Sequence, residues 1–350
     1  MHVPTRFVTL DAMRGVAAIA VAIYHVDDYL GYKSSAPLAV DFFFVLSGFV
    51  VAYAYDNRLA SGMSFRQFAE KRAIRLYPLY FFGQLLGVLA ALLCLWLGRP
   101  TLAAWEIAAA FFLGMLWLPS PFQGMTRRLF PLNNPSWSLF WEVVVNAAYG
   151  LFHKRLTTPA LLATASAGGL VILYYAFVMH NADVGTNWDS VPGGAARALY
   201  SFSIGILLCR HRERIPERLG RVGGAPLLIL LGVLLLMPRH LPTDLLFIAV
   251  VSPLLVAAGS RVTGDDLRLF RFLGAISFPL YAIHRPLLDP LDIVVDNILL
   301  PRPVVGIGYV AAMVWLAWLV VPMDIKVRSY LTRQANRRGA RITNTRIEVP

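Results

Sequence analysis

Residues 10–29, LDAMRGVAAIAVAIYHVDDY, decide the fold of this chain. The stretch can cross a bilayer as one helix, because about 20 mostly apolar residues span the hydrocarbon core. Asp11, Arg14 and His25 nevertheless interrupt it. Eleven positions separate Arg14 from His25, which in a helix places both on one face, about 16 Å apart along the axis. Ionisable groups in a membrane are costly and rarely kept without a use, so this face is predicted to line a polar site in a helical bundle.

The composition is that of a membrane protein. The 350 residues are 57% hydrophobic and 15% charged, with a mean hydropathy of +0.60, whereas soluble domains carry about 25% charged residues. Long apolar runs recur along the chain and predict an all-α, polytopic transmembrane bundle. The net charge is +12, and the basic residues cluster in loops and in the tail. This pattern fits the positive-inside rule of membrane proteins better than it fits nucleic-acid binding. Cys94 and Cys209 lie in apolar runs, where neither a disulfide nor a metal site is expected.

The charge pattern predicts about ten spans with both termini in the cytoplasm. The expected spans are 10–29, 40–55, 76–97, 136–152, 159–179, 195–209, 224–237, 244–259, 271–288 and 303–321. Between the basic loop 56–75 and the basic cluster 153–155 the chain must cross an even number of times, yet three apolar segments lie there. The shortest, 103–118, is therefore predicted to be re-entrant or interfacial, and the irregular loop 119–135 to be external. A membrane domain over 1–325 and a basic cytoplasmic tail over 326–350 follow.

Two arginines three residues apart lie in KRAIRLYP, at a predicted cytoplasmic boundary. Arg72 and Arg75 share a helical face, and two guanidinium groups can hold a phosphate or pyrophosphate bidentately. The alternative is that they only anchor the helix at the membrane surface.

A second polar group begins the helix in NNPSWSLFWE. Ser138 and Glu142 are four apart and share a face, while Ser136 is expected to be an N-cap. Glu142 lies inside an apolar helix, where a carboxylate is suited either to proton transfer or to a structural ion pair with a buried arginine.

Two further motifs carry candidate supporting residues. In VDFFFVLSGFV, Asp41 precedes Ser47 and Gly48. The glycine is expected to allow close helix packing and the serine to bond back to its own helix. In ISFPLYAIHRP, Tyr281 and His284 are three apart on a helix expected to begin after Pro279, where they either reach the site or mark the outer interface.

Taken together, these segments resemble a known family. LDAMRGVAAIAVAIYH, VDFFFVLSGF, RAIRLYP, SWSLFWE and GAISFPLYAIHRP occur in this order over about residues 7–325, and together they resemble the membrane-bound acyltransferase family 3. The family has a basic residue and a histidine separated by ten residues, and these two positions fall on Arg14 and His25. Its Arg-x-x-Arg falls on Arg72 and Arg75, and its Ser-Trp-Ser-Leu-x-x-Glu on residues 136–142, Trp137 included. Where the family has Ser-Tyr this chain has Ser277-Phe278, so a hydroxyl role at Phe278 is not expected.

The resemblance implies transfer of an acyl group, usually acetyl from acetyl-CoA, to a hydroxyl of a cell-surface or exported carbohydrate or glycolipid at the inner membrane. Acyl-CoA is then a co-substrate, no metal or permanently bound cofactor is expected, and no extracytoplasmic esterase-like domain is expected.

The residues suggest roles for this reaction. His25 would be the general base or a transient acyl carrier. Glu142 is expected to lie within reach of His25, where it would orient the imidazole or share its proton. Arg14 would hold the donor or an oxyanion, and Asp11, Asp41, Ser136, Trp137, Ser138, Tyr281 and His284 would support the site. A proton-coupled transporter, which also buries arginine, histidine and glutamate, remains the alternative, and a non-catalytic lipid- or glycan-binding scaffold is a third possibility.

Overall fold

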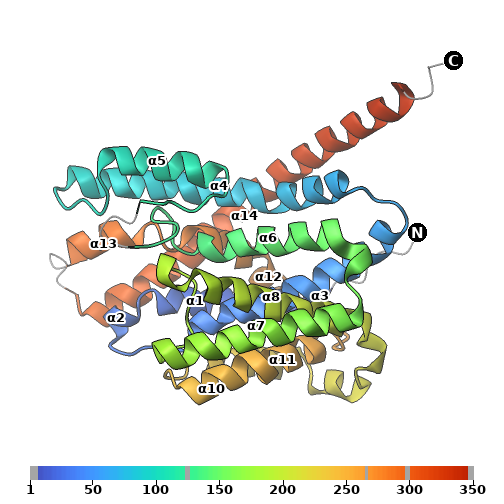
Figure 1. Ribbon diagram of the computed structural model, residues 1–350. Helices are drawn as coiled ribbons and strands as arrows, with labels where there is room; N and C mark the ends of the chain where they lie inside the picture. Colours follow the sequence, from blue (N-terminus) through green and yellow to red (C-terminus); the bar gives the residue numbers. More distant parts are fainter. Residues whose placement is uncertain (1–6, 123–126, 265–266, 296–299, 346–350) are drawn as a thin grey trace.

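The computed structural model describes residues 7–122, 127–264, 267–295 and 300–345. Within these residues every named secondary-structure element is a helix. They run roughly along one direction, and the far end of α14 projects beyond the rest (Figure 1). The helices that build the bundle are α1 (Val8–Tyr24), α3 (Ala39–Ala60), α4 (Phe65–Trp96), α5 (Ala104–Met115), α6 (Ser136–Phe152), α7 (Thr158–Met179), α8 (Val191–Arg210), α9 (Gly224–Leu236), α11 (Ser252–Gly259), α12 (Arg268–Ile283) and α14 (Arg302–Thr345). Shorter elements connect them: α2 (Asp27–Leu30), α10 (Leu241–Leu246), the π-helical turn η6 (Phe247–Val251) and α13 (Leu288–Val294).

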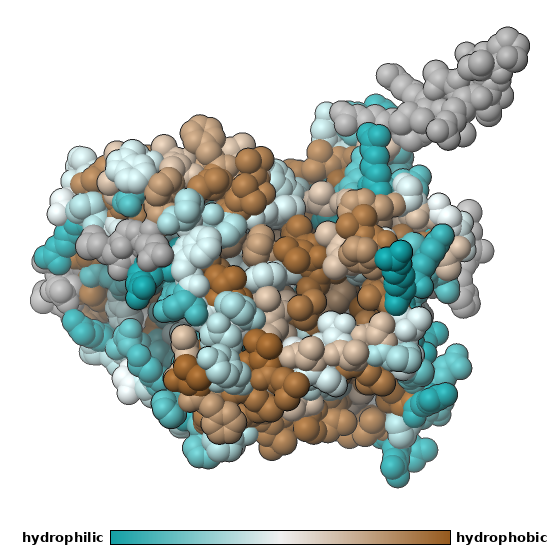
Figure 2. All heavy atoms as spheres, viewed as in Figure 1, coloured by the Kyte–Doolittle hydropathy of each residue, from teal (hydrophilic) through white to brown (hydrophobic). Residues whose placement is uncertain are grey.

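Six helical segments among the described residues are long and apolar enough to cross a membrane. They are Ala36–Ala60, Phe65–Trp96, Thr158–Met179, Trp188–Arg210, Leu241–Gly259 and Arg302–Arg337. Figure 2 shows hydrophobic residues concentrated across the middle of the visible face and hydrophilic residues at its two ends. The chain is therefore an all-helical, multi-pass membrane protein, as the apolar runs predicted. The count of about ten spans and the orientation of the termini stay predictions.

The segment 103–118 forms the short helix α5. Twelve residues at 1.5 Å each extend about 18 Å, less than the roughly 30 Å of the hydrocarbon core. The helix packs against α4 (Figure 1). Its length is compatible with the prediction that the segment does not cross fully.

Two local expectations are corrected, and the start of the predicted tail is described. The basic loop 56–75 is mostly helical, because α3 continues to Ala60 and α4 starts at Phe65, where Ser64 and Gln67 form a capping box. The late helix α12 does not begin after Pro279 but contains it. The first part of the predicted tail, 326–345, continues α14, and residues 346–350 lie outside the described part of the chain.

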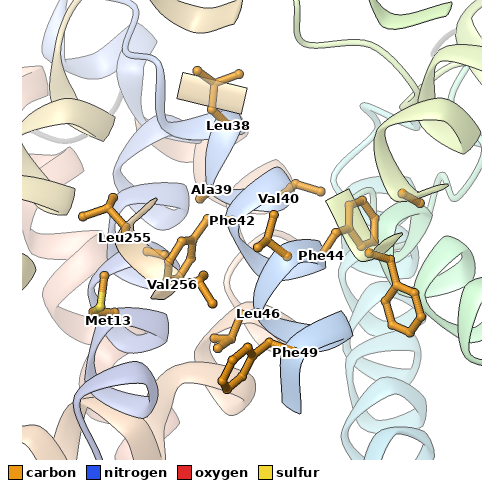
Figure 3. Close-up of a cluster of buried hydrophobic side chains, with 14 of the residues drawn as sticks. Met13, Leu38, Ala39, Val40, Phe42, Phe44, Leu46, Phe49, Leu255 and Val256 are labelled. Carbon is orange, nitrogen blue, oxygen red and sulfur yellow. The ribbon is translucent and has the colours of Figure 1, made fainter. Parts of the chain in front are cut away.

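The core lies between α1, α3, α8, α11 and α12. Figure 3 shows Met13 of α1, Phe42 and Phe49 of α3 and Val256 of α11 in one apolar cluster. The helices approach closely: a Cβ added at Gly48 would lie 2.2 Å from the Phe202 carbonyl oxygen of α8. The expected packing role of Gly48 is confirmed, and this tight packing holds α3 in the position from which it lines the cavities described below.

Candidate active site

The first cavity, here called the inner cavity, lies among α1, α3, α4, α6 and α12 and measures about 100 Å³. Most of its wall is apolar. Its polar lining residues are Arg14, Ser47, Arg72, Arg75, Ser138, Glu142, Ser277 and Tyr281. All five of the motifs singled out in the sequence therefore meet here, although they lie far apart along the chain.

Arg14 is fixed against α12 at the edge of this cavity. Its Nε donates to the Ser277 hydroxyl at 2.8 Å and its Nη2 to the Gly274 carbonyl at 3.3 Å. Asp11, one turn earlier, forms an ion pair with Nη2 at 3.3 Å. The family's serine thus has a role at Ser277, as a partner of Arg14, while Phe278 contributes an apolar surface to the cavity.

Glu142 joins two helices to its own. Its Oε1 accepts a hydrogen bond from Arg72 Nη2 at 2.9 Å and another from the Ser47 hydroxyl at 3.0 Å. Ser47 therefore does not bond back to its own helix as expected, because the glutamate offers a stronger, charged acceptor. Both Glu142 and Arg72 are largely buried, so the carboxylate is paired and hydrogen-bonded.

The two arginines of the Arg-x-x-Arg motif have different surroundings. Arg72 is committed to Glu142, whereas Arg75 forms no hydrogen bond or ion pair with the described residues and also lines a second cavity. This basic cavity measures about 860 Å³ and is lined by α3, α4 and α14, including Arg58, Lys71 and Arg328. Arg75 therefore lies where the basic cavity and the inner cavity meet.

His25 lies at the other end of α1, of which it is the C-cap. Two adjoining cavities at this end of α1, here called the outer cavities, measure about 460 and 320 Å³. They share Tyr24, His25, Arg128 and Asn134 in their walls. The His25 ring packs 5.0 Å, centroid to centroid, from the ring of His284. His25 is thus accessible from the end of the bundle opposite to the basic cavity.

The contacts of His284 define which of its ring nitrogens carries the proton. Nδ1 lies 3.0 Å from the Leu280 carbonyl and 3.1 Å from the Tyr281 carbonyl, and since carbonyls only accept, Nδ1 carries the hydrogen. Nε2 then carries a lone pair and no hydrogen, and it is buried without a partner among the described residues. The His284 and His25 rings are adjacent, and no hydrogen bond joins them among the described residues.

Tyr281 stands between the inner and outer cavities. It lines the inner cavity and the smaller outer one, and its hydroxyl lies 2.6 Å from Ser138 Oγ and 3.3 Å from the Pro135 carbonyl. His25 and Glu142, expected within reach of each other, line different cavities, and no hydrogen bond or ion pair joins them in the described part of the chain. That expectation is not met. The spacing of residues within single helices could not predict that Tyr281 of α12 lies between the two cavities.

Asp41 is held by a residue that sequence reasoning missed. Arg197, fully buried in α8, binds both carboxylate oxygens of Asp41, with distances of 2.6–3.2 Å, and the carbonyls of Pro37 and Val184. Its guanidinium also lies 5.4 Å from the Trp137 ring. An arginine inside an apolar helix was the signal that could have revealed it. The pair fixes the N-terminal end of α3.

Ser136 is not the N-cap it was expected to be. Helix α6 begins at Ser136 itself, and Pro135 precedes it without a side-chain cap. The buried Ser136 hydroxyl instead accepts a hydrogen bond from Gln84 of α4 at 3.0 Å. Ser136 therefore ties α6 to α4, next to the wall that Ser138 and Tyr281 form.

Comparison with known proteins identifies the family to which this arrangement belongs. A family model described as an acyltransferase domain matches residues 7–321, which include all the motif residues above. The chain belongs to the acyltransferase 3 family. The resemblance drawn from the motifs is thereby confirmed, and an acyl donor and an acyl acceptor are the substrates that membership implies.

Two relatives are similar to parts of this acyltransferase. It is 38% identical over 182 residues to a protein named protein 2 in picA locus from Rhizobium radiobacter, across 49% of this chain and 94% of that protein. It is 28% identical over 170 residues to acyltransferase MdmB from Streptomyces mycarofaciens, across 43% of this chain and 41% of that protein. No solved structure matches the chain.

Two further observations concern metal and cysteine chemistry. In the described residues no three or more His, Cys, Asp or Glu side chains gather where a metal ion could be held. Cys94 and Cys209 are free and buried, as their positions in apolar runs predicted.

Proposed function

We propose that this acyltransferase moves an acyl group, acetyl in the first instance, from cytoplasmic acyl-CoA to a hydroxyl of a cell-surface or exported carbohydrate or glycolipid, and that it does so in the inner membrane. The observation that carries the proposal is the arrangement of the cavities. Arg75 lines both a basic cavity and the inner cavity, His25 lines two outer cavities, and Tyr281 lines both the inner cavity and the smaller outer one.

The basic cavity suits the nucleotide part of the donor. Coenzyme A carries a phosphate and a pyrophosphate, and Arg58, Lys71 and Arg75 present cations in a cavity of about 860 Å³. The positive-inside rule independently puts this end in the cytoplasm. Of the two motif arginines, Arg75 is the one whose guanidinium fork remains available for phosphate oxygens, while Arg72 keeps the Glu142 carboxylate in place.

The inner cavity suits the acyl end. Arg14, oriented by Ser277, is a fixed donor that can hold a carbonyl oxygen of the donor's pantetheine arm, because it lies about 16 Å along α1 from His25. At His25 the imidazole either accepts the proton of the acceptor hydroxyl directly or first carries the acyl group itself. In both routes the carbon–sulfur bond breaks, a carbon–oxygen bond to the acceptor forms, and the hydroxyl proton ends on the coenzyme A thiolate. Glu142 is the carboxylate on the donor side that can pass this proton on.

His284 has a positioning role in this proposal. Its Nε2 lone pair is buried and unpartnered beside the His25 ring, so an N–H of His25 can donate to it. Such a bond selects the His25 tautomer whose other nitrogen is free to accept a proton, as an orienting partner does in catalytic dyads.

The test measures both halves of the reaction in purified protein. Acetyl-CoA binding and acetyl transfer to glycans from a deletion strain, detected by mass spectrometry, are compared for wild type, His25→Ala and Glu142→Gln, with the exposed His240→Ala as matched control. We expect both site variants to lose transfer by at least about 100-fold while His25→Ala still binds acetyl-CoA. Near-normal transfer by His25→Ala would contradict the mechanism. Solute movement without consumption of acetyl-CoA would favour the transporter instead.

A further inference from the structure

The larger outer cavity has an unusual balance of charges. Its wall contains five basic side chains, Lys33, Arg128, Arg239, Arg285 and Arg302, and three acidic ones, Asp27, Asp28 and Asp292. With about 460 Å³ it falls within the range of cavities that hold small-molecule ligands. His25 lies in the same wall. Any ligand that presents a hydroxyl to His25 therefore also meets these charges.

Most of these charges already have partners. Arg239 pairs with Asp183 at 3.1 Å and Arg285 with Asp289 at 2.5 Å. Lys33 lies 3.8 Å from Asp28. These contacts satisfy the cations within the protein, so they need no ligand for charge balance.

The acids are occupied as well. Asp27 accepts hydrogen bonds from the backbone and hydroxyl of Ser34, and Asp292 accepts one from the Tyr29 hydroxyl. Neither carboxylate is engaged with a cation of the wall in these contacts. Neither acid is therefore in direct contact with Arg128.

Arg128 is the exception among the cations. It lies within the loop 119–135 and lines both outer cavities, yet its side chain forms no hydrogen bond or ion pair with any described residue. Burial, followed by the positive charge of Arg285, lowers the pKa of Arg128 from its ordinary value, although Asp289 and Asp292 act in the opposite direction. The Arg128 guanidinium offers five N–H donors to the two cavities that it lines.

We infer that Arg128, with Arg285 beside it, binds an anionic group of the acceptor, a phosphate or a carboxylate. A planar guanidinium matches either group bidentately. The inference rests on the proposed function in one respect, namely that the bound molecule is the acyl acceptor. Held by its charge at Arg128, an acceptor sugar has its hydroxyl positioned towards His25, which reduces the entropy cost of reaction. The acceptor class is thus an acidic or phosphorylated carbohydrate rather than a neutral one.

Binding by purified protein in a phosphate-free, uncharged detergent tests this directly. The probes are glucose 1-phosphate, glucuronate and glucose, measured by calorimetry. We expect one of the charged sugars to bind about tenfold or more tightly than glucose, and the preferred one tells phosphate from carboxylate. Arg128→Gln should remove the preference, and Arg128→Lys should restore only part of it.

Arg127→Gln is the matched control, because Arg127 precedes Arg128 and is exposed. It should keep the charge preference, with unchanged thermal stability in all variants as a check on folding. Equal binding of glucose and both charged sugars by wild type, or an undiminished preference in Arg128→Gln, would overturn the inference.

Acetyl-CoA binding, measured on the same samples, separates this inference from the proposed function. Charge-selective sugar binding without acetyl-CoA binding supports the anion site and contradicts acyl transfer. Acetyl-CoA binding without charge selectivity overturns the anion site and leaves acyl transfer standing.

Discussion

The buried pair of Asp41 and Arg197 allows a prediction whose size follows from the structure. Asp41→Ala removes three contacts of 2.6–3.2 Å from a guanidinium that is 0% exposed. Arg197 keeps the carbonyls of Pro37 and Val184, and Asp183 remains 3.5 Å away. Removing one partner of a buried pair costs about 3–5 kcal/mol, and these remaining acceptors place the expected loss near the lower end, about 3 kcal/mol.

The assay is unfolding of purified protein in mixed micelles by sodium dodecyl sulfate, followed by circular dichroism. Asp28→Ala is the control, because Asp28 faces Lys33 at 3.8 Å with both side chains exposed, and it should cost less than about 0.5 kcal/mol. The double variant Asp41→Leu with Arg197→Met removes both charges and should recover most of the loss. If Asp41→Ala were as stable as Asp28→Ala, or if the double variant were less stable than Asp41→Ala, the reasoning would be wrong.

Three further outcomes are expected. Gly48→Ala should lower stability, because the new Cβ would lie 2.2 Å from a backbone carbonyl of α8, whereas Gly308→Ala, with nothing within 4 Å, should not; thermal unfolding of both compares them. Tyr281→Phe and Ser138→Ala should each slow acyl transfer about tenfold by breaking their 2.6 Å contact, and a double variant about 100-fold slower, the product of the two losses, would contradict a shared role. Arg75→Lys keeps the charge but loses the fork, so acetyl-CoA should bind more weakly at normal protein levels; calorimetry showing unchanged affinity would exclude donor contact.

The positions of the helices were largely predictable from the sequence, and their ends were not. Apolar runs located α3, α7 and α8 because burial in lipid demands long hydrophobic segments. The start of α4 was placed too late, since its first turns are polar and depend on the Ser64 capping box rather than on hydrophobicity. Pro279 was read as a start signal, yet it is accommodated within α12.

The candidate site was predictable one helix at a time. Spacing within a helix correctly put Ser138 and Glu142 on one face, and both line the inner cavity. Spacing says nothing about which helices are neighbours, so the contact of Glu142 with Arg72 and the separation of Glu142 from His25 needed the fold. Arg128 was missed because a loop has no periodicity, and its significance depends on having no partner in space.

The position of Tyr281 has a consequence for the energy supply of the cell. Cavities approach this residue from both ends of the bundle, and a continuous column of water between them would short-circuit the proton gradient that drives much of membrane bioenergetics. The buried side chain of Tyr281, held by its contact with Ser138, then separates the two bodies of water as well as forming part of a site. Such an enzyme must transfer an acyl group without letting protons flow freely across the membrane. This favours a large side chain, such as that of Tyr281, at the position between the cavities.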